Sequence, residues 1–125
     1  MLRASHAVLR TRGRIAGYTI HVAPGLDPDG ARSAAECGPS EVMTDVPYEE
    51  LFGTAGFRMV LSEDVTTEFE ATCRAIFTAR EDREAALRTA EGDTLFEEEQ
   101  ENKARLIEGL STGVLKRSLH VAVKP

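Results

Sequence analysis

The chain has 125 residues, of which 42% are hydrophobic and 29% are charged, and its formal net charge is −6. This composition is ordinary for a globular domain, and no apolar run approaches the roughly 20 residues that a membrane-spanning helix requires. The excess of acidic side chains argues against nucleic acid as a partner. Because residues 1–14 lack the apolar core of a secretory signal, we expect a cytoplasmic protein.

Cysteines and histidines are few and widely spaced. Cys37 and Cys73 are too few for a disulfide framework and have no metal-ligand spacing. The histidines, His6, His21 and His120, show no zinc pattern. We therefore predict no metal site.

Charge is distributed unevenly along the chain. Residues 1–14 contain four arginines and no acidic residue, whereas glutamates crowd positions 97–101. Solvated faces explain both features, and a patch for phosphate or RNA is the alternative for the basic stretch.

The first half of the chain predicts one strand and three short helices. A helix over residues 2–9 ends before Gly13. The run from Arg14 to Val22 is mostly apolar without clean alternation, which indicates a strand buried on both faces. A weak helix from Pro28 to about residue 37 follows, and Asp45 caps another short helix.

The second half predicts two more strands around a helical pair. A strand over residues 57–65 places Phe57, Met59 and Leu61 on one face and Val60 on the other. Helices over residues 66–91 and 94–110 are separated by Gly92, and residues 114–125 form the last strand. The inward stripes of the helices are Phe69, Cys73, Ile76, Phe77 and Leu87, then Leu95, Phe96, Leu106, Ile107 and Leu110. The mixture indicates an α/β fold.

Three segments resemble class I S-adenosylmethionine-dependent methyltransferases. "HAVLRTRGRIAGYTI" resembles the late helix–turn–strand of that family, whose pattern is roughly Leu-Arg-Pro-Gly-Gly-Arg before the strand; Thr11 and Arg12 depart from it. "YEELFGTAGFRMVLSEDVT" is similar to the next segment, with the sixth strand, and "VLKRSLHVAVKP" to the seventh, antiparallel strand. The resemblance implies the carboxyl-terminal half of a Rossmann-like methyltransferase fold. Its sheet would be three-stranded and mixed, with a two-helix insertion before the last strand.

The resemblance also bears on the cofactor. In the family, a glycine-rich loop after the first strand and an acidic residue after the second hold the cofactor, and both precede the segments matched here. The only comparable stretch, "GTAG" at 53–56, follows a helix and precedes a strand, which is the wrong context. We expect no cofactor site in this chain alone, and S-adenosylmethionine only where a partner chain completes the site.

His21 is the candidate for a catalytic or substrate-binding residue. It ends the first strand, and open α/β sheets bind ligands beyond the carboxyl ends of their strands. An imidazole titrates near neutral pH and can serve as a general base. The alternative is a half-buried side chain with a packing role.

The helical insertion, residues 66–112 of a single domain spanning 1–125, resembles a cap over the active-site mouth. Phe69, Phe77 and Phe96 would then be walls of the substrate pocket. Aromatic residues at helical spacing are also typical of a core, which is the alternative for all three.

The strand over residues 14–22 would lie at an edge of the sheet where another family strand normally pairs. An apolar edge without proline invites pairing, so we expect a homodimer or a protein partner that covers it. Three functions remain open: a methyltransferase-like unit that is inactive alone and depends on a dimer or partner, the substrate-binding part of a split active methyltransferase, and a small-ligand-binding module.

Overall fold

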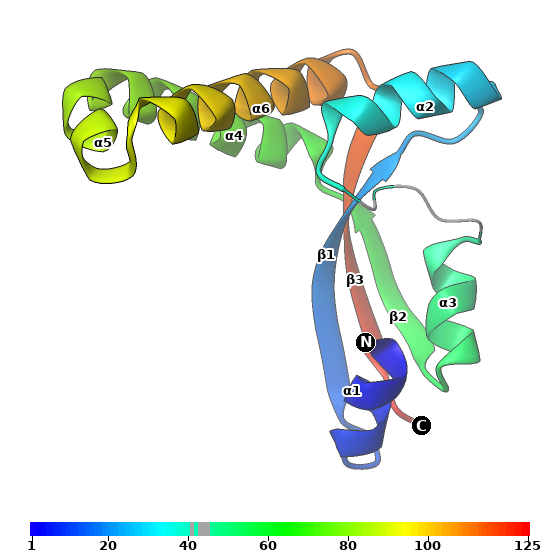
Figure 1. Ribbon diagram of the computed structural model, residues 1–125. Helices are drawn as coiled ribbons and strands as arrows, with labels where there is room; N and C mark the ends of the chain where they lie inside the picture. The colour runs from blue at the N-terminus through cyan, green and yellow to red at the C-terminus, as the bar shows by residue number, and fades with distance from the viewer. Residues whose placement is uncertain (41, 43–45) are drawn as a thin grey trace.

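The sheet has three strands in the order β1-β3-β2, so the last strand of the chain lies in its centre. The computed structural model describes residues 1–40, 42 and 46–125, with β1 at Arg14–Val22, β2 at Arg58–Asp64 and β3 at Leu115–Val123. Strand β3 runs antiparallel to both neighbours, so β1 and β2 are parallel to each other (Figure 1). The α/β fold, the antiparallel last strand and the edge position of β1 are confirmed. The predicted cap Asp45 lies outside the described residues.

Helices α1 (Leu2–Val8) and α3 (Tyr48–Thr54) pack on one face of the sheet. The cluster between them and the strands is built on Phe52, Phe57 and Ala122, which are 6%, 5% and 0% exposed. This face therefore carries the lower hydrophobic core of the molecule.

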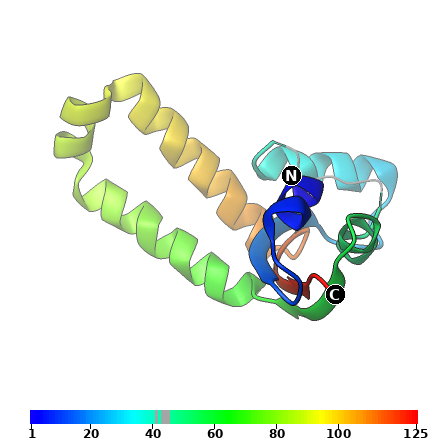
Figure 2. The same ribbon diagram turned by 90° about the horizontal axis from the view of Figure 1, so that it is seen from below.

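A long helical arm joins β2 to β3. It consists of α4 (Thr66–Asp82), α5 (Glu84–Glu91) and α6 (Asp93–Ser111), with α4 and α6 side by side and α5 at the far end (Figures 1 and 2). The sequence predicts two helices between these strands, and the structure has three. The helix is interrupted at Arg83, whose backbone (φ −116°, ψ 20°) is not helical. The sequence beside it contains neither glycine nor proline, the residues that usually signal such a break. None of the described helices is long and apolar enough to span a bilayer.

The arm is rooted in a second core above the sheet. Cys73, Leu106, Leu110 and Leu115 form this cluster, and helix α2 (Pro28–Cys37) contributes Cys37 to it. The predicted burial of Cys73 is confirmed, because the residue is 1% exposed.

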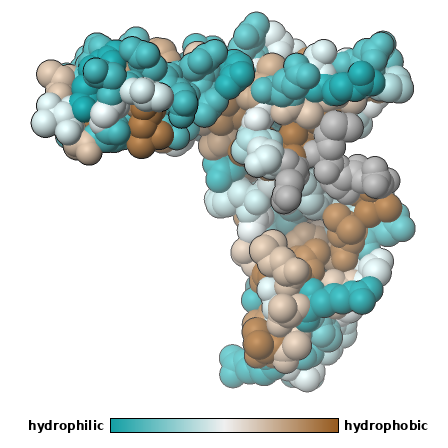
Figure 3. Space-filling view, in the orientation of Figure 1, coloured by the Kyte–Doolittle hydropathy of each residue, from teal (hydrophilic) through white to brown (hydrophobic). Residues whose placement is uncertain are grey.

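Away from its root the arm is only a pair of helices, so part of each helix stays in water. Ile76 and Leu95, both predicted to face inward, are 43% and 44% exposed. Figure 3 shows hydrophilic residues over most of the arm and more apolar residues around the lower part of the sheet.

The face of the sheet opposite α1 and α3 is open below the arm, as far as the described residues show. Tyr18 of β1 is 58% exposed, so the prediction that this strand is buried on both faces is wrong. The reason is that helix α1 packs in the cluster on the other face and helix α2 joins the upper cluster through Cys37, so neither covers the open face at Tyr18.

A bulge in β2 overturns one predicted side-chain direction. The register shifts between Met59, which pairs with Ala122, and Leu61, which pairs with Val121. One extra residue turns the following side chains to the other face. Met59 therefore packs in the lower core, whereas Leu61, predicted to share its face, is 42% exposed.

Candidate functional site

A row of polar side chains crosses the sheet on the face that carries α3. Residues two apart on a strand share a face. The antiparallel register places Thr19 of β1 opposite Ser118 of β3, and Ser62 of β2 opposite His120 of β3. Three segments far apart in the sequence thus bring their hydrogen-bonding groups together in the middle of the sheet.

His120 joins the three strands from the centre of this row. Its side chain is 5% exposed; Nε2 lies 2.9 Å from Thr19 Oγ1 and Nδ1 lies 3.1 Å from Ser62 Oγ. Burial, and secondarily the charge of His21, lowers the pKa of His120. The ring is therefore neutral at physiological pH, with one nitrogen donating to a hydroxyl and the other accepting from one.

His21 lies near the carboxyl end of β1, as predicted. Its Nδ1 is 3.2 Å from the carbonyl oxygen of Val22, and its Nε2 is 2.9 Å from Ser118 Oγ. A carbonyl oxygen only accepts hydrogen bonds, so Nδ1 donates to it and carries the ring proton. In the neutral ring, Nε2 then accepts from the Ser118 hydroxyl.

Tyr48, the first residue of α3, covers both imidazoles. The centroid of its ring lies 6.0 Å from that of His21 and 5.3 Å from that of His120. Burial raises the pKa of Tyr48, so the phenol stays protonated at neutral pH and remains able to donate a hydrogen bond.

These groups line a half-open cavity of about 570 Å³. Its polar lining comes from His21, Tyr48, Glu49, Ser62, Ser118 and His120, and its apolar lining comes from Val22, Pro24, Ala31, Val42, Val46 and Pro47. Apolar walls with a few convergent polar groups are typical of a small-molecule site of this size. A neutral imidazole beside an exchangeable hydroxyl can accept a proton from a bound ligand.

The three phenylalanines predicted as pocket walls lie elsewhere. Phe69 packs against the upper cluster where the arm meets the sheet, and the Cζ atom of Arg117 lies 4.0 Å from the centroid of the Phe69 ring. Phe77 lines a smaller cavity of about 340 Å³ between α4 and α6. Phe96 is 4% exposed and lies under Arg80 and Arg88. None of them lines the cavity at His21 among the residues described, and their contact with a substrate stays a prediction.

The sequence interpretation missed His120, Ser62, Ser118 and Tyr48 as neighbours of His21. The spacing of two between Ser118 and His120 places both on one face of a strand, but only the register brings that face to His21. Within the part of the chain that the structure describes, no group of three or more metal-binding side chains comes together.

Comparison with known proteins gives a fold rather than a close relative. No protein-family model matches the chain, and no curated protein does. Solved structures do match. A protein assigned as a sarcosine dimethylglycine methyltransferase from Galdieria sulphuraria aligns with a TM-score of 0.83 at 14% identity, over 98% of this chain and 46% of that one.

Two further structures agree with this match. The mycolic acid cyclopropane synthase CmaA1 aligns with a TM-score of 0.80 at 15% identity, over 98% of this chain and 51% of its own. Phosphoethanolamine N-methyltransferase 2 from Haemonchus contortus, solved with S-adenosylhomocysteine and phosphomonomethylethanolamine, aligns with a TM-score of 0.65 at 15% identity, over 99% of this chain and 29% of its own.

These proteins are class I S-adenosylmethionine-dependent methyltransferases, so the fold resemblance expected from the sequence is confirmed. The chain has part of a methyltransferase fold, and it spans only about half of the first two structures that it matches, 46% and 51%. CmaA1 is also known with S-adenosylhomocysteine bound.

Proposed function

We propose that this chain is the acceptor-side part of a methyltransferase-like protein and that it depends on a dimer or partner for any activity. One observation carries the proposal: nearly the whole chain, 98%, aligns with only 46% and 51% of two complete methyltransferase-fold proteins. The part of the fold present here contains the cavity at His21. The glycine-rich loop that holds the cofactor in the family has no counterpart in this sequence.

The cavity supplies what a methyl acceptor needs from the protein. An acceptor must lose a proton as its oxygen or nitrogen gains the methyl group. His21 Nε2 takes that proton, either directly or through the Ser118 hydroxyl at 2.9 Å. Tyr48 and His120 orient the acceptor with neutral groups, and the apolar walls exclude water from it. S-adenosylmethionine, when bound by residues outside this chain, would supply the methyl group.

Protein-observed NMR tests the acceptor site. We expect neutral aromatic fragments such as phenol and indole to shift the amide resonances of Ser62, Ser118 and His120. Tyr48→Ala should weaken this binding about tenfold, because the substitution removes an aromatic wall worth about 1.4 kcal/mol. Tyr18→Ala is the matched control, since Tyr18 lies on the opposite face and should leave the affinity unchanged. Shifts confined to α4 and α6 around Phe77, or no shifts at all, would contradict the proposal.

A small-ligand-binding module is the second candidate function. The cavity of about 570 Å³ favours it, because a pocket of this size can hold a complete small molecule without any transfer chemistry. His21→Gln separates the two functions. A binding module should keep most of its affinity for a fragment, whereas the methyltransferase assembled with its cofactor-binding partner should lose methyl transfer.

A further inference from the structure

Within the residues that the structure describes, strand β1 presents an unpaired edge. It is the outer strand of the sheet, so every second N–H and C=O group points away from β3. The amide of Ala23 bonds to the carbonyl of Val114 at 2.8 Å, so the outward groups belong to the even-numbered residues Ala16, Tyr18 and Ile20. The strand has no proline, and from residue 15 to residue 20 it has no charged side chain. It lacks the devices that normally prevent strand pairing.

The edge is complementary to itself. Tyr18 is the central residue of the nine in β1, so antiparallel pairing about a twofold axis at Tyr18 leaves no overhang. That register places Ala16 opposite Ile20 of the second copy, and Gly17 opposite its Thr19. Ala16, Tyr18 and Ile20 share the open face of the sheet, where the Arg117 guanidinium lies 4.2 Å from the centroid of the Tyr18 ring, so pairing would bring these side chains of both copies together on one face.

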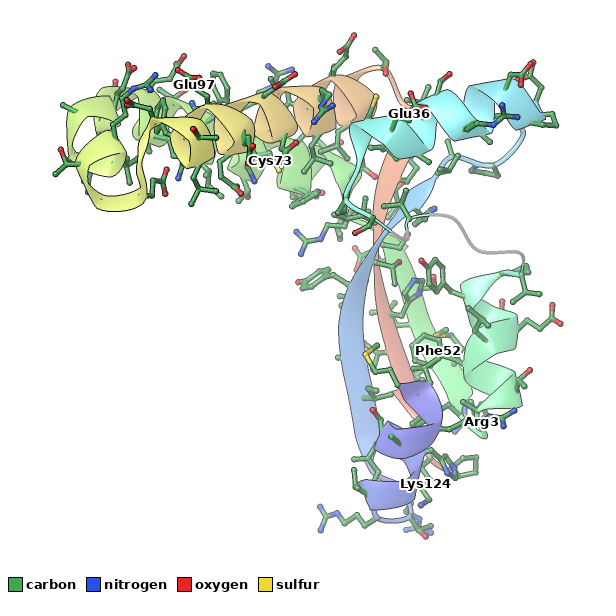
Figure 4. All side chains as sticks on the ribbon, in the orientation of Figure 1. Arg3, Glu36, Phe52, Cys73, Glu97 and Lys124 are labelled. Atoms are coloured by element: carbon green, nitrogen blue, oxygen red, sulfur yellow. The ribbon has the colours of Figure 1, made fainter. Side chains whose placement is uncertain are left out.

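The charges of the molecule fit the same arrangement. The arm from Thr66 to Ser111 contains twelve acidic and six basic side chains, which accounts for the whole net charge of −6. Residues 1–26 contain four arginines and no acidic residue. Figure 4 shows Arg3 and Lys124 at the lower end of the sheet and Glu97 far out on the arm.

The direction of the arm connects these two observations. In both views the arm runs out from the top of the sheet on the β1 side, beyond the edge strand (Figures 1 and 2). A copy paired antiparallel to β1 would be inverted, with its basic end at the top, beside the acidic arm. The twofold axis would create the reciprocal contact at the other end.

We propose that two copies of this chain associate through β1 into a six-stranded sheet, with the acidic arm of each copy beside the basic amino-terminal end of the other. The inference concerns the dimer named in the proposed function; a second copy brings no glycine-rich loop, so it is not the cofactor-binding partner. The inference rests on the β1 edge and the charge distribution, not on the acceptor site.

Sedimentation velocity tests the strand pairing. We expect the chain to sediment as a dimer, at twice its 13.6 kDa, at tens of micromolar. Tyr18→Pro removes an outward N–H that β3 does not use, so it should give a folded monomer. Tyr18→Phe is the matched control and should stay dimeric. Ile20→Lys, which places a charge at the edge, serves as a second blocking variant if the proline variant fails to fold.

Sedimentation of the wild-type chain as a monomer at 100 μM would overturn the inference. Pairing of β1 only with a different protein would overturn it as well. Dimers that survive both folded edge variants would place the interface elsewhere and overturn it as well. A monomeric chain would leave the acceptor site unaffected, whereas loss of fragment binding at His21 would leave the dimer unaffected. The two proposals can therefore fail separately.

Salt and charge reversal test the arm contact. Raising NaCl from 50 to 500 mM should increase the dimer dissociation constant about tenfold, because exposed charges are screened. Arg10→Glu should weaken the dimer at low salt, and adding Glu98→Arg should restore part of the loss. If neither salt nor Arg10→Glu changed the dimer dissociation constant, the proposed contact between the arm and the amino-terminal end would be wrong.

Discussion

Gly109 of α6 lies at the point where the arm crosses β3 and α2. A Cβ atom at this position would be 2.7 Å from Leu115 Cδ1 and 3.0 Å from the Cβ of Cys37. Leu115 is completely buried, so it has little room to move aside. The absence of a side chain at residue 109 therefore sets how closely the arm approaches the sheet.

We predict that Gly109→Ala lowers the free energy of unfolding by about 1–3 kcal/mol, because it overpacks the arm root. Gly53→Ala in α3 is the control: nothing lies within 4 Å of its Cβ position, so the change should be neutral or stabilise by up to about 1 kcal/mol. Urea denaturation measures both. Equal stability of Gly109→Ala and the wild type would mean that the arm does not pack on Leu115 as described.

His120 makes stability depend on pH in a defined window. Burial lowers its pKa in the folded chain, so the unfolded chain takes up the proton at a higher pH than the folded chain does. Stability is therefore complete above the unfolded value of about 6.5 and falls as the pH drops below it. We expect a lower melting temperature at pH 5.5 than at pH 7.5, and a smaller difference in His120→Gln. An identical pH profile in that variant would contradict the assignment.

At the residue scale, the sequence could identify candidates but not their neighbours. His21 was found because it ends an apolar strand, a local feature. His120 has an equally plain position in the last strand, yet its contact with Ser62 depends on a register that a bulge in β2 shifts. Neighbours across a sheet are a long-range property, and no local pattern in this sequence encodes them.

Asp64 stabilises the start of the arm. Its Oδ1 accepts hydrogen bonds from the amide of Thr66 at 2.9 Å and from Thr66 Oγ1 at 2.5 Å. The hydroxyl bond and then the amide bond lower the pKa of Asp64, so the carboxylate is charged when it receives them. This side chain therefore satisfies a free amide at the first turn of α4.

We predict that Asp64→Ala lowers the free energy of unfolding by about 1 kcal/mol, the usual effect of losing a hydrogen bond at a helix start. Glu63→Ala, next in the chain but on the other face of the strand, should change it by less than about 0.5 kcal/mol. Guanidinium denaturation of the two variants compares them directly. A larger effect at Glu63 than at Asp64 would show that α4 begins differently.

Lys124 holds helix α1 on the sheet. Its Nζ donates to the carbonyl oxygens of His6 at 2.7 Å and Leu9 at 2.8 Å, at the carboxyl end of that helix. Lys124→Met keeps most of the aliphatic stem and removes the donors. We expect faster amide hydrogen exchange in residues 2–9 of this variant, with β3 unchanged; Lys103→Met in the arm is the control. Unaltered exchange in α1 would mean that apolar packing alone fixes the helix.

At the element scale, most helices and strands were predictable because their apolar periods and glycine stops are local signals. The break at Arg83 was not, since Glu81, Glu84 and Ala85 favour helix and neither glycine nor proline lies beside it. The two long helices were therefore predicted, whereas α5 was not. The edge position of β1 and the antiparallel direction of β3 came from the resemblance to methyltransferases, not from the residue pattern.

At the scale of the whole molecule, the fold has one covered and one open side. Helices α1 and α3 cover one face of the sheet, while Tyr18, Val60 and Leu61 stay 58%, 49% and 42% exposed. Exposed apolar residues on an edge strand and its neighbouring face are the basis on which we propose that this surface binds a second copy. The chain aligns with only about half of two methyltransferase-fold structures, and in those proteins more of the fold lies beyond the aligned part.

The central claim is that this chain carries an acceptor-side site and no cofactor site of its own. Calorimetric titration of the purified chain with S-adenosylmethionine, at its measured mass in solution, tests that claim most directly. We predict no saturable heat up to about 1 mM ligand, which corresponds to a binding free energy weaker than about −4 kcal/mol. Saturable binding with a Kd near 1 μM, about −8 kcal/mol, would contradict it and would mean that residues of this chain build a cofactor site by themselves.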